Sequence, residues 1–195
     1  GMGAAAAVSR VFGGLRMGVI AAVLGTTYLG NTFQASNSVS NVLFELLAAG
    51  ALSAVLVPTF VDLFARDETR RAEEVAGRVL GLALVVLGVV SVLGVVFAPA
   101  LARLLTARVE DPEVLAAQRD LATFLLRFFV PQVLLYAVGA VTTAVLHARG
   151  RFALAAVAPV GNTIVLVAAM VAFRSMAGAD PGLDLSTGER LCLAL

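Results

Sequence analysis

Residues 79–98 read VLGLALVVLGVVSVLGVVFA, twenty consecutive positions without a charged side chain. A helix that crosses a lipid bilayer needs roughly 20 predominantly apolar residues, and this run is long enough. A strand of a membrane barrel would be about half as long and would alternate polar with apolar residues, which this run does not do. The stretch therefore predicts a transmembrane α-helix and an all-α fold.

The composition of the whole chain is typical of a membrane protein. Of 195 residues, 60% are hydrophobic and 14% are charged, whereas soluble domains have roughly 45–50% apolar and 25% charged residues. The net charge of +1 gives no electrostatic argument for a nucleic-acid partner. With one histidine and one cysteine, the sequence contains no pattern that predicts a metal site, a cofactor or an enzyme's catalytic group.

Apolar windows separated by polar segments predict a polytopic bundle of transmembrane helices. The five windows are 8–29, 32–64, 75–105, 119–146 and 153–175. A sixth begins near Glu189, and the chain ends before this segment reaches the roughly 20 residues that a span requires. We therefore expect residues 1–195 to be a truncated piece of a longer membrane protein.

Charge divides the connecting loops into two kinds. Arginines gather at 66–78 and 149–151, whereas acidic residues gather at 107–118 and 176–189. Arginine-rich loops remain on the cytoplasmic side of a bacterial membrane. Together with Arg10, this pattern predicts a multi-pass plasma-membrane protein whose amino terminus is cytoplasmic.

Five polar side chains of the second window share one face of the predicted helix. At 100° per residue they fall within an arc of about 100°, and they are Gln34, Asn37, Ser38, Asn41 and Glu45. An ionisable group inside the bilayer costs at least about 2.5–3.5 kcal/mol on insertion scales. The pattern predicts a water-lined surface, with Asn37, Asn41 and Glu45 as candidate substrate contacts. The alternative is that amides and hydroxyls hold neighbouring helices together.

Four positions within the predicted spans favour bending: Gly50 and Pro58 in the second, Pro131 in the fourth and Pro159 in the fifth. Proline removes a backbone donor and clashes with the carbonyl four residues earlier. Bent helices line the cavities of transporters that rock between two openings, although static bundles also contain prolines. We interpret these four residues as candidate hinges.

Arg10 and Arg16 lie in the first predicted span, and Arg127 lies well within the fourth. The planar, permanently charged guanidinium group binds phosphate through paired hydrogen bonds. All three are therefore candidate contacts for an anionic headgroup. For Arg10 the alternative is an anchor at the membrane surface.

Three segments resemble the MurJ (MviN) lipid II flippase family, which is part of the multidrug/oligosaccharidyl-lipid/polysaccharide exporter superfamily. They are SRVFGGLR at 9–16, SNVLFELLAAGALSAVLVPTF at 40–60, and AVLHARGRF with APVGN within 144–162. The first is similar to that family's pattern SRxxGxxR, which places Arg10 and Arg16 on its two arginines. The second is similar to the family's PNLxR and AEGALSxAFVPxF segments.

The resemblance implies two six-helix lobes around a central cavity, with this chain as most of the amino-terminal lobe. It implies alternating-access transport of lipid II, the undecaprenyl-pyrophosphate-linked precursor of peptidoglycan, with cavity arginines holding the pyrophosphate. The implied partners are this lipid-linked anionic saccharide, the bilayer and, as candidates, cell-wall synthesis proteins. No cofactor is implied.

Several positions depart from the family pattern. Asn31 and Ala49 stand where the family has acids, Phe44 replaces an arginine, Ser40 replaces a proline, and Glu45 occupies a position that is often basic. Export of another lipid-linked saccharide and multidrug-type antiport, with Glu45 as the ion site, therefore remain alternatives. A non-transporting scaffold that recruits cell-wall enzymes is a further one.

Overall fold

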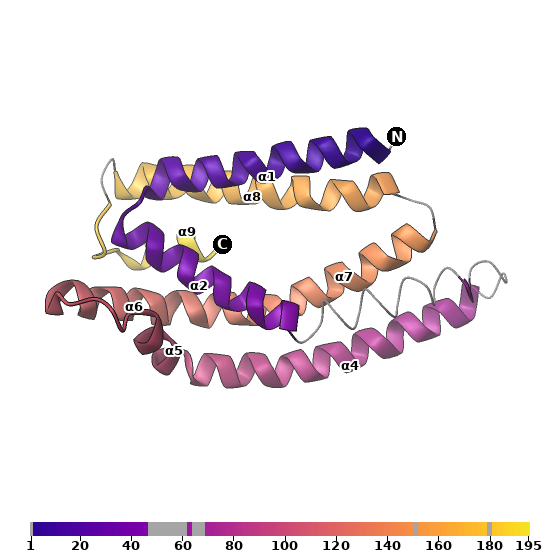
Figure 1. Cartoon of the computed structure of the whole chain (residues 1–195), viewed down its shortest axis with the longest axis horizontal. Helices are drawn as coiled ribbons and strands as arrows, with labels where there is room; N and C mark the ends of the chain where they lie inside the picture. Colours follow the sequence, from indigo (N-terminus) through magenta and orange to yellow (C-terminus); the bar gives the residue numbers. More distant parts are fainter. Residues whose placement is uncertain (1, 47–61, 64–68, 150–151, 179–180) are drawn as a thin grey trace.

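The computed structural model confirms the all-α fold class (Figure 1). It describes residues 2–46, 62–63, 69–149, 152–178 and 181–195, and for residues 2–10, 12, 69 and 152–160 it describes the backbone only. The helices are α1 (Met2–Leu24), α2 (Tyr28–Phe44), α4 (Thr69–Val96), α5 (Ala98–Leu105), α6 (Pro112–Phe129), α7 (Val133–Ala148), α8 (Phe152–Ala177) and α9 (Thr187–Ala194), with a 3-10 segment η2 (Val130–Gln132) between α6 and α7.

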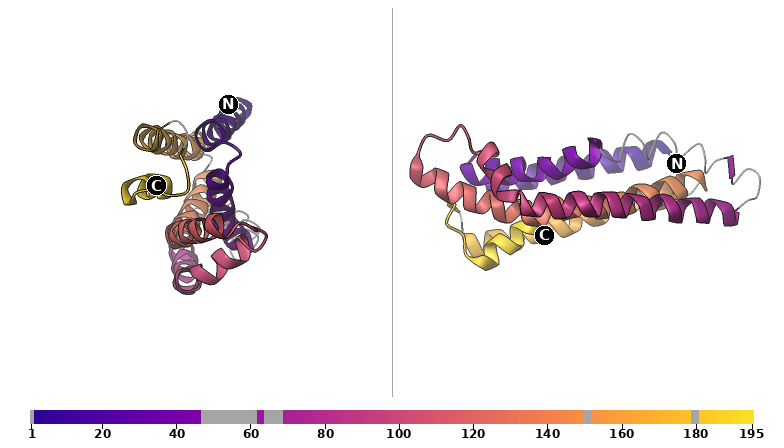
Figure 2. Two further views of the ribbon diagram at one scale, coloured as in Figure 1. Left: turned by 90° about the vertical axis from the view of Figure 1, so that its left-hand side faces the viewer. Right: turned by 90° about the horizontal axis from the view of Figure 1, so that it is seen from below.

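The helices form an elongated bundle (Figures 1 and 2). Helices α1 and α8 lie side by side along one side of it, α4 and α6 lie on the opposite side, and α7 runs obliquely from the end of α6 toward the start of α8. Helix α2 packs against α6, while α9 packs against both α8 and α6. The two sides are thus joined through α2, α7 and α9.

Two described helical stretches are long and apolar enough to cross a membrane. These stretches are Arg70–Val96 and Pro112–Ala148. Two further apolar helices are shorter, Gly13–Leu24 and Gly161–Ala177. The exposed side chains of α4 include Leu82, Val85 and Val89. An apolar outer surface of this kind suits contact with lipid chains.

Prolines divide two of the windows expected to be single helices. The third window becomes α4 and α5, because Pro99 occupies the first turn of α5, where its missing N–H costs nothing. The helix of the fourth window begins at Pro112. Its N-cap is Asp111, whose carboxylate accepts hydrogen bonds from the amides of Glu113 and Val114 at 3.0 and 3.4 Å. It is then interrupted at η2, which contains Pro131.

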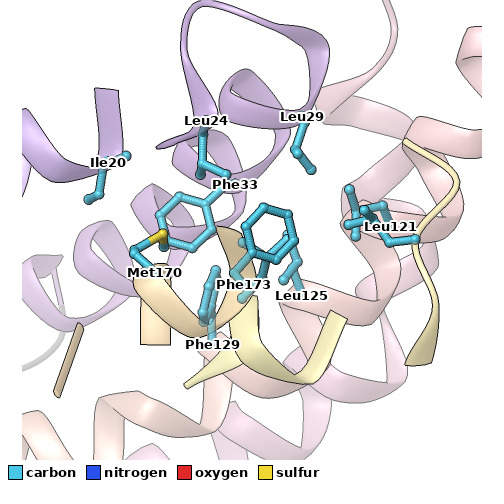
Figure 3. Packing of buried hydrophobic residues seen from close by; sticks show 11 residues of the cluster. Ile20, Leu24, Leu29, Phe33, Leu121, Leu125, Phe129, Met170 and Phe173 are labelled. Atoms are coloured by element: carbon cyan, nitrogen blue, oxygen red, sulfur yellow. The ribbon is translucent and has the colours of Figure 1, made fainter. Parts of the chain in front are cut away.

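The largest buried cluster among the described residues joins α1, α2, α6, α8 and α9 at the α1–α2 end of the bundle (Figure 3). It includes Ile20, Leu24, Leu29, Phe33, Leu121, Leu125, Phe129, Met170 and Phe173. The rings of Phe33 on α2 and Phe129 on α6 meet edge to face, with centroids 5.5 Å apart, a favoured arrangement for aromatic pairs. Inside a bilayer, such close packing is what holds helices together.

Glycine allows close approach at two places. A Cβ added to Gly94 on α4 would lie 2.5 Å from Cγ1 of Val130 in η2. In the turn between α1 and α2, Gly25 has a φ of +62°, which glycine adopts readily. A Cβ added to Gly30 would lie 2.5 Å from the carbonyl oxygen of Gly25. Both contacts need the absence of a side chain.

Candidate substrate site

A small polar cavity lies between the two sides of the bundle. Its volume is about 30 Å³. Four polar residues line it: Arg16 from α1, Asn37 from α2, Gln132 from η2 and Asn162 from α8. Apolar residues of the α1–α2 end cluster, including Phe33, Phe129, Met170 and Leu193, complete its wall. The cavity thus brings one cation and three amides together, of which Asn162 is exposed at its edge.

Arg16 carries a positive charge that the described residues do not balance. Its side chain is half-buried, and among the described residues it has neither an ion pair nor a hydrogen bond. It lies close enough to Tyr136 on α7 to act on that hydroxyl electrostatically. Tyr136 in turn packs edge to face on Phe44, with ring centroids 5.6 Å apart. Because Arg16 also lines the cavity, its unpaired charge is available to an anion there.

The described helices do not seal the polar face of α2. Gln34 and Asn37 are half-buried, and Asn41 and Glu45 are exposed. Only Asn37 of these four lines the cavity. Ser38 lies in a separate, mostly apolar groove. The surface predicted from the spacing is therefore open along α2, but it does not form one site.

The remaining candidate residues lie elsewhere. Arg127 is exposed on α6 and does not line the cavity. Pro131 is half-buried within η2, and the helix assignment of α8 continues through Pro159. Gly50 and Pro58 lie outside the described residues, as do the side chains of Arg10 and Pro159.

Two cavity residues, Gln132 and Asn162, were not predicted from the sequence. Each is a single amide within an otherwise apolar stretch, in PQVLLY and in APVGN. Polar residues inside membrane spans usually face the bundle interior and mark functional sites. The position of Gln132 and Asn162 as single amides within apolar stretches is therefore the signal in the sequence that could have identified them. The Oε1 atom of Gln132 is buried and has no hydrogen-bond partner among the described residues.

An apolar helical bundle with an arginine and three amides around a cavity between its helices has the features of a membrane transporter. Residues 20–191 match the family model for lipid II flippase MurJ, and the chain therefore belongs to the MurJ family. Members of this family are membrane transporters and not enzymes. The resemblance seen in the sequence is thus confirmed.

Several curated relatives are similar to this chain. A probable lipid II flippase MurJ of Rhizobium tropici is 29% identical over 92% of this chain and 33% of its own length. The corresponding proteins of Vibrio cholerae and Haemophilus influenzae are 26% and 28% identical, over 82% and 93% of this chain and 31% and 36% of their own lengths. The chain therefore spans about a third of these relatives. No solved structure matches it.

Proposed function

We propose that the full-length protein carries lipid II across the bacterial plasma membrane by alternating access, and that this chain is most of its amino-terminal lobe. The observation that carries the proposal is the unbalanced charge of Arg16 beside Asn37, Gln132 and Asn162. An arginine fork with amide donors suits a pyrophosphate group. Membership of the MurJ family supports the choice of substrate.

The size of the cavity implies that the bundle must open to admit such a headgroup. Its volume of about 30 Å³ has room for only a few water molecules, since one water needs roughly 10–15 Å³ of such space, and a pyrophosphate joined to a saccharide is larger than that. Helices α1 and α8 lie on one side of the cavity, and α2 and η2 lie on the other. Separation of these two sides would enlarge it.

The other proposed contacts and hinges complete this scheme. Arg10, Asn41, Glu45 and Arg127 would meet the headgroup when the lobe is open, Arg127 from the exposed face of α6. The proposed hinges are Gly50, Pro58, Pro131 and Pro159, and the 3-10 geometry around Pro131 supports one of them. The amino terminus would be cytoplasmic, and cell-wall synthesis proteins are the proposed partners.

Depletion of the full-length protein tests this function. In cells without a second flippase, depletion should trap the lipid-linked precursor on the inner leaflet, because no other path crosses the bilayer. The measurement is the fraction of precursor that an outside enzyme or probe can reach. Re-expression of the protein should restore this fraction. An unchanged distribution across the two leaflets would contradict the proposal.

Multidrug-type antiport is the second candidate, because Glu45 is an exposed acid without an ion pair among the described residues. An antiporter needs such an acid to bind its coupling ion. Under the flippase proposal, Glu45→Gln should leave the dependence of transport on pH and sodium unchanged, since the acid only borders the substrate. The measurement is transport by the full-length protein in liposomes at two pH values, with and without sodium. Loss of that dependence in the variant would favour antiport.

A further inference from the structure

Helix α9 forms part of the wall of the polar cavity between the two sides of the bundle. Cys192 and Leu193 of α9 line the cavity, as does Leu195 directly after the helix. The helix packs on α8 of one side and on α6 of the other, and it lies between them in Figures 1 and 2. If the two sides separate, as the proposed function requires, α9 must leave one of them.

The order of the helices along the chain indicates that α9 stays with α8. The short segment 178–186 connects these two helices directly, whereas α6 comes much earlier in the chain. Two residues of α9 also approach Met176 near the end of α8. A Cβ added to Gly188 would lie 3.0 Å from Cε of Met176, and the thiol of Cys192 lies 3.8 Å from its sulfur. The contact between α9 and α6 is therefore the one that opening must break.

An ion pair joins α9 to α6 at this contact. Nη1 of Arg190 on α9 lies 2.6 Å from Oδ2 of Asp120 on α6. Nε of the same guanidinium group donates a hydrogen bond to the carbonyl of Leu185 at 3.0 Å, which fixes the direction of the side chain. The nearby acid Glu189 is used elsewhere, because its carboxylate accepts from the amide of Ser186 at 2.7 Å in the capping box of α9. Arg190 is thus held by its own segment and reaches across to α6.

The rest of the α9–α6 contact is apolar. Leu193 is 1% exposed and belongs to the same buried cluster as Leu121 and Leu125 of α6. Apolar contacts between membrane helices compete with equally apolar lipid chains and are weakly directional. The ion pair is directional, and its charged partners lie on the two elements that must separate.

We propose that the Arg190–Asp120 ion pair is a latch that holds α9 on α6 and keeps the polar cavity closed, and that it opens when the headgroup enters or leaves. This inference rests on the proposed function, because it concerns access to the same site. The side chain of Arg190 is 21% exposed and that of Asp120 is 66% exposed. Ion pairs at exposed positions shift an equilibrium by up to about fivefold. Such a latch favours the closed state and is still weak enough to break in each transport cycle.

The reactivity of Cys192 in the cavity wall tests the latch. Full-length protein in which Cys192 is the only cysteine is placed in phospholipid nanodiscs, and the rate of its reaction with a water-soluble maleimide is measured. A thiol reacts as the thiolate, so the rate rises when water reaches the cavity wall. Asp120→Asn should raise the rate by up to about fivefold. Asp120→Arg should raise it further, because two like charges then face each other.

Exchange of the two charges separates a latch from a general loss of structure. Adding Arg190→Asp to the Asp120→Arg variant restores opposite charges and should return the rate toward that of the unsubstituted protein, whereas independent damage at two sites would add. The matched control is Glu113→Arg, an equal charge change at an exposed acid on α6 outside the latch, which should leave the rate unchanged. An unchanged rate in Asp120→Arg, an equal rise in Glu113→Arg, or no rescue by the exchange would overturn the latch.

Translocation of lipid II, measured in the same proteins, distinguishes failure of the latch from failure of the proposed function. Normal translocation with a Cys192 rate that does not respond to Asp120→Arg would overturn the latch and leave the function standing. A rate that rises and is rescued as expected, in a protein that translocates no lipid II even when unsubstituted, would contradict the function. The latch would then stand as a contact that closes the cavity to water.

Discussion

Replacing Arg16 by glutamine in the full-length protein should lower the rate of lipid II translocation by about tenfold or more. Glutamine keeps hydrogen-bonding capacity but loses the charge, and a hydrogen bond to a charged group is worth about 1.5–3 kcal/mol. Each 1.4 kcal/mol corresponds to about a factor of ten. The loss should be large because no other cation lines the described cavity. The measurement is translocation in liposomes that contain purified protein.

Two further variants make this prediction specific. Arg16→Lys should retain part of the activity, since the charge remains but the planar fork is lost. Arg103→Gln removes an arginine that is exposed on α5, outside the cavity lining, and should behave like the unmodified protein. An equal loss in the Arg16→Gln and Arg103→Gln variants would indicate a general effect of charge on insertion, and Arg16 would lose its proposed role.

The features that sequence predicted are those that depend on local pattern. The charge-free run at 79–98 predicted a membrane helix, and most of it lies in α4. Arg16 and Asn37 were singled out because polar groups inside apolar helices are costly, and the structure brings both to one cavity. Hydrophobicity and periodicity determine which residues lie in a span and on which face of it.

Depth along a helix and contacts between helices were not predictable in this way. Asn41 and Glu45 share the face of Asn37, but at 1.5 Å per residue they lie about 6 and 12 Å further along α2. The lining of the cavity includes Asn37 but neither Asn41 nor Glu45. Gln132 and Asn162 reach the cavity only because η2 and α8 pack beside α1 and α2, an arrangement that depends on tertiary packing.

Replacing Gly30 by alanine should destabilise the protein by about 1–3 kcal/mol, the range for overpacked cores. The added Cβ would lie 2.5 Å from the Gly25 carbonyl oxygen and 3.2 Å from that of Leu24. These are backbone atoms, so no side chain can rotate away. The turn is also held by Thr27, whose hydroxyl donates to the Leu24 carbonyl at 2.7 Å and accepts from the Gly30 amide at 3.2 Å.

Gly88→Ala on α4 is the matched control, because nothing lies within 4 Å of the added Cβ. Alanine in a helix interior is favoured over glycine by roughly 0.5–1 kcal/mol, so this variant should be neutral or slightly stabilised. The measurement is the temperature at which half of the detergent-solubilised full-length protein is lost from its monodisperse chromatographic peak. Gly30→Ala should lower that temperature and Gly88→Ala should not. Equal temperatures for the two variants would show that the backbone of the α1–α2 turn can move to accept the added Cβ. The close packing of this turn would then not determine the position of α1 beside the cavity.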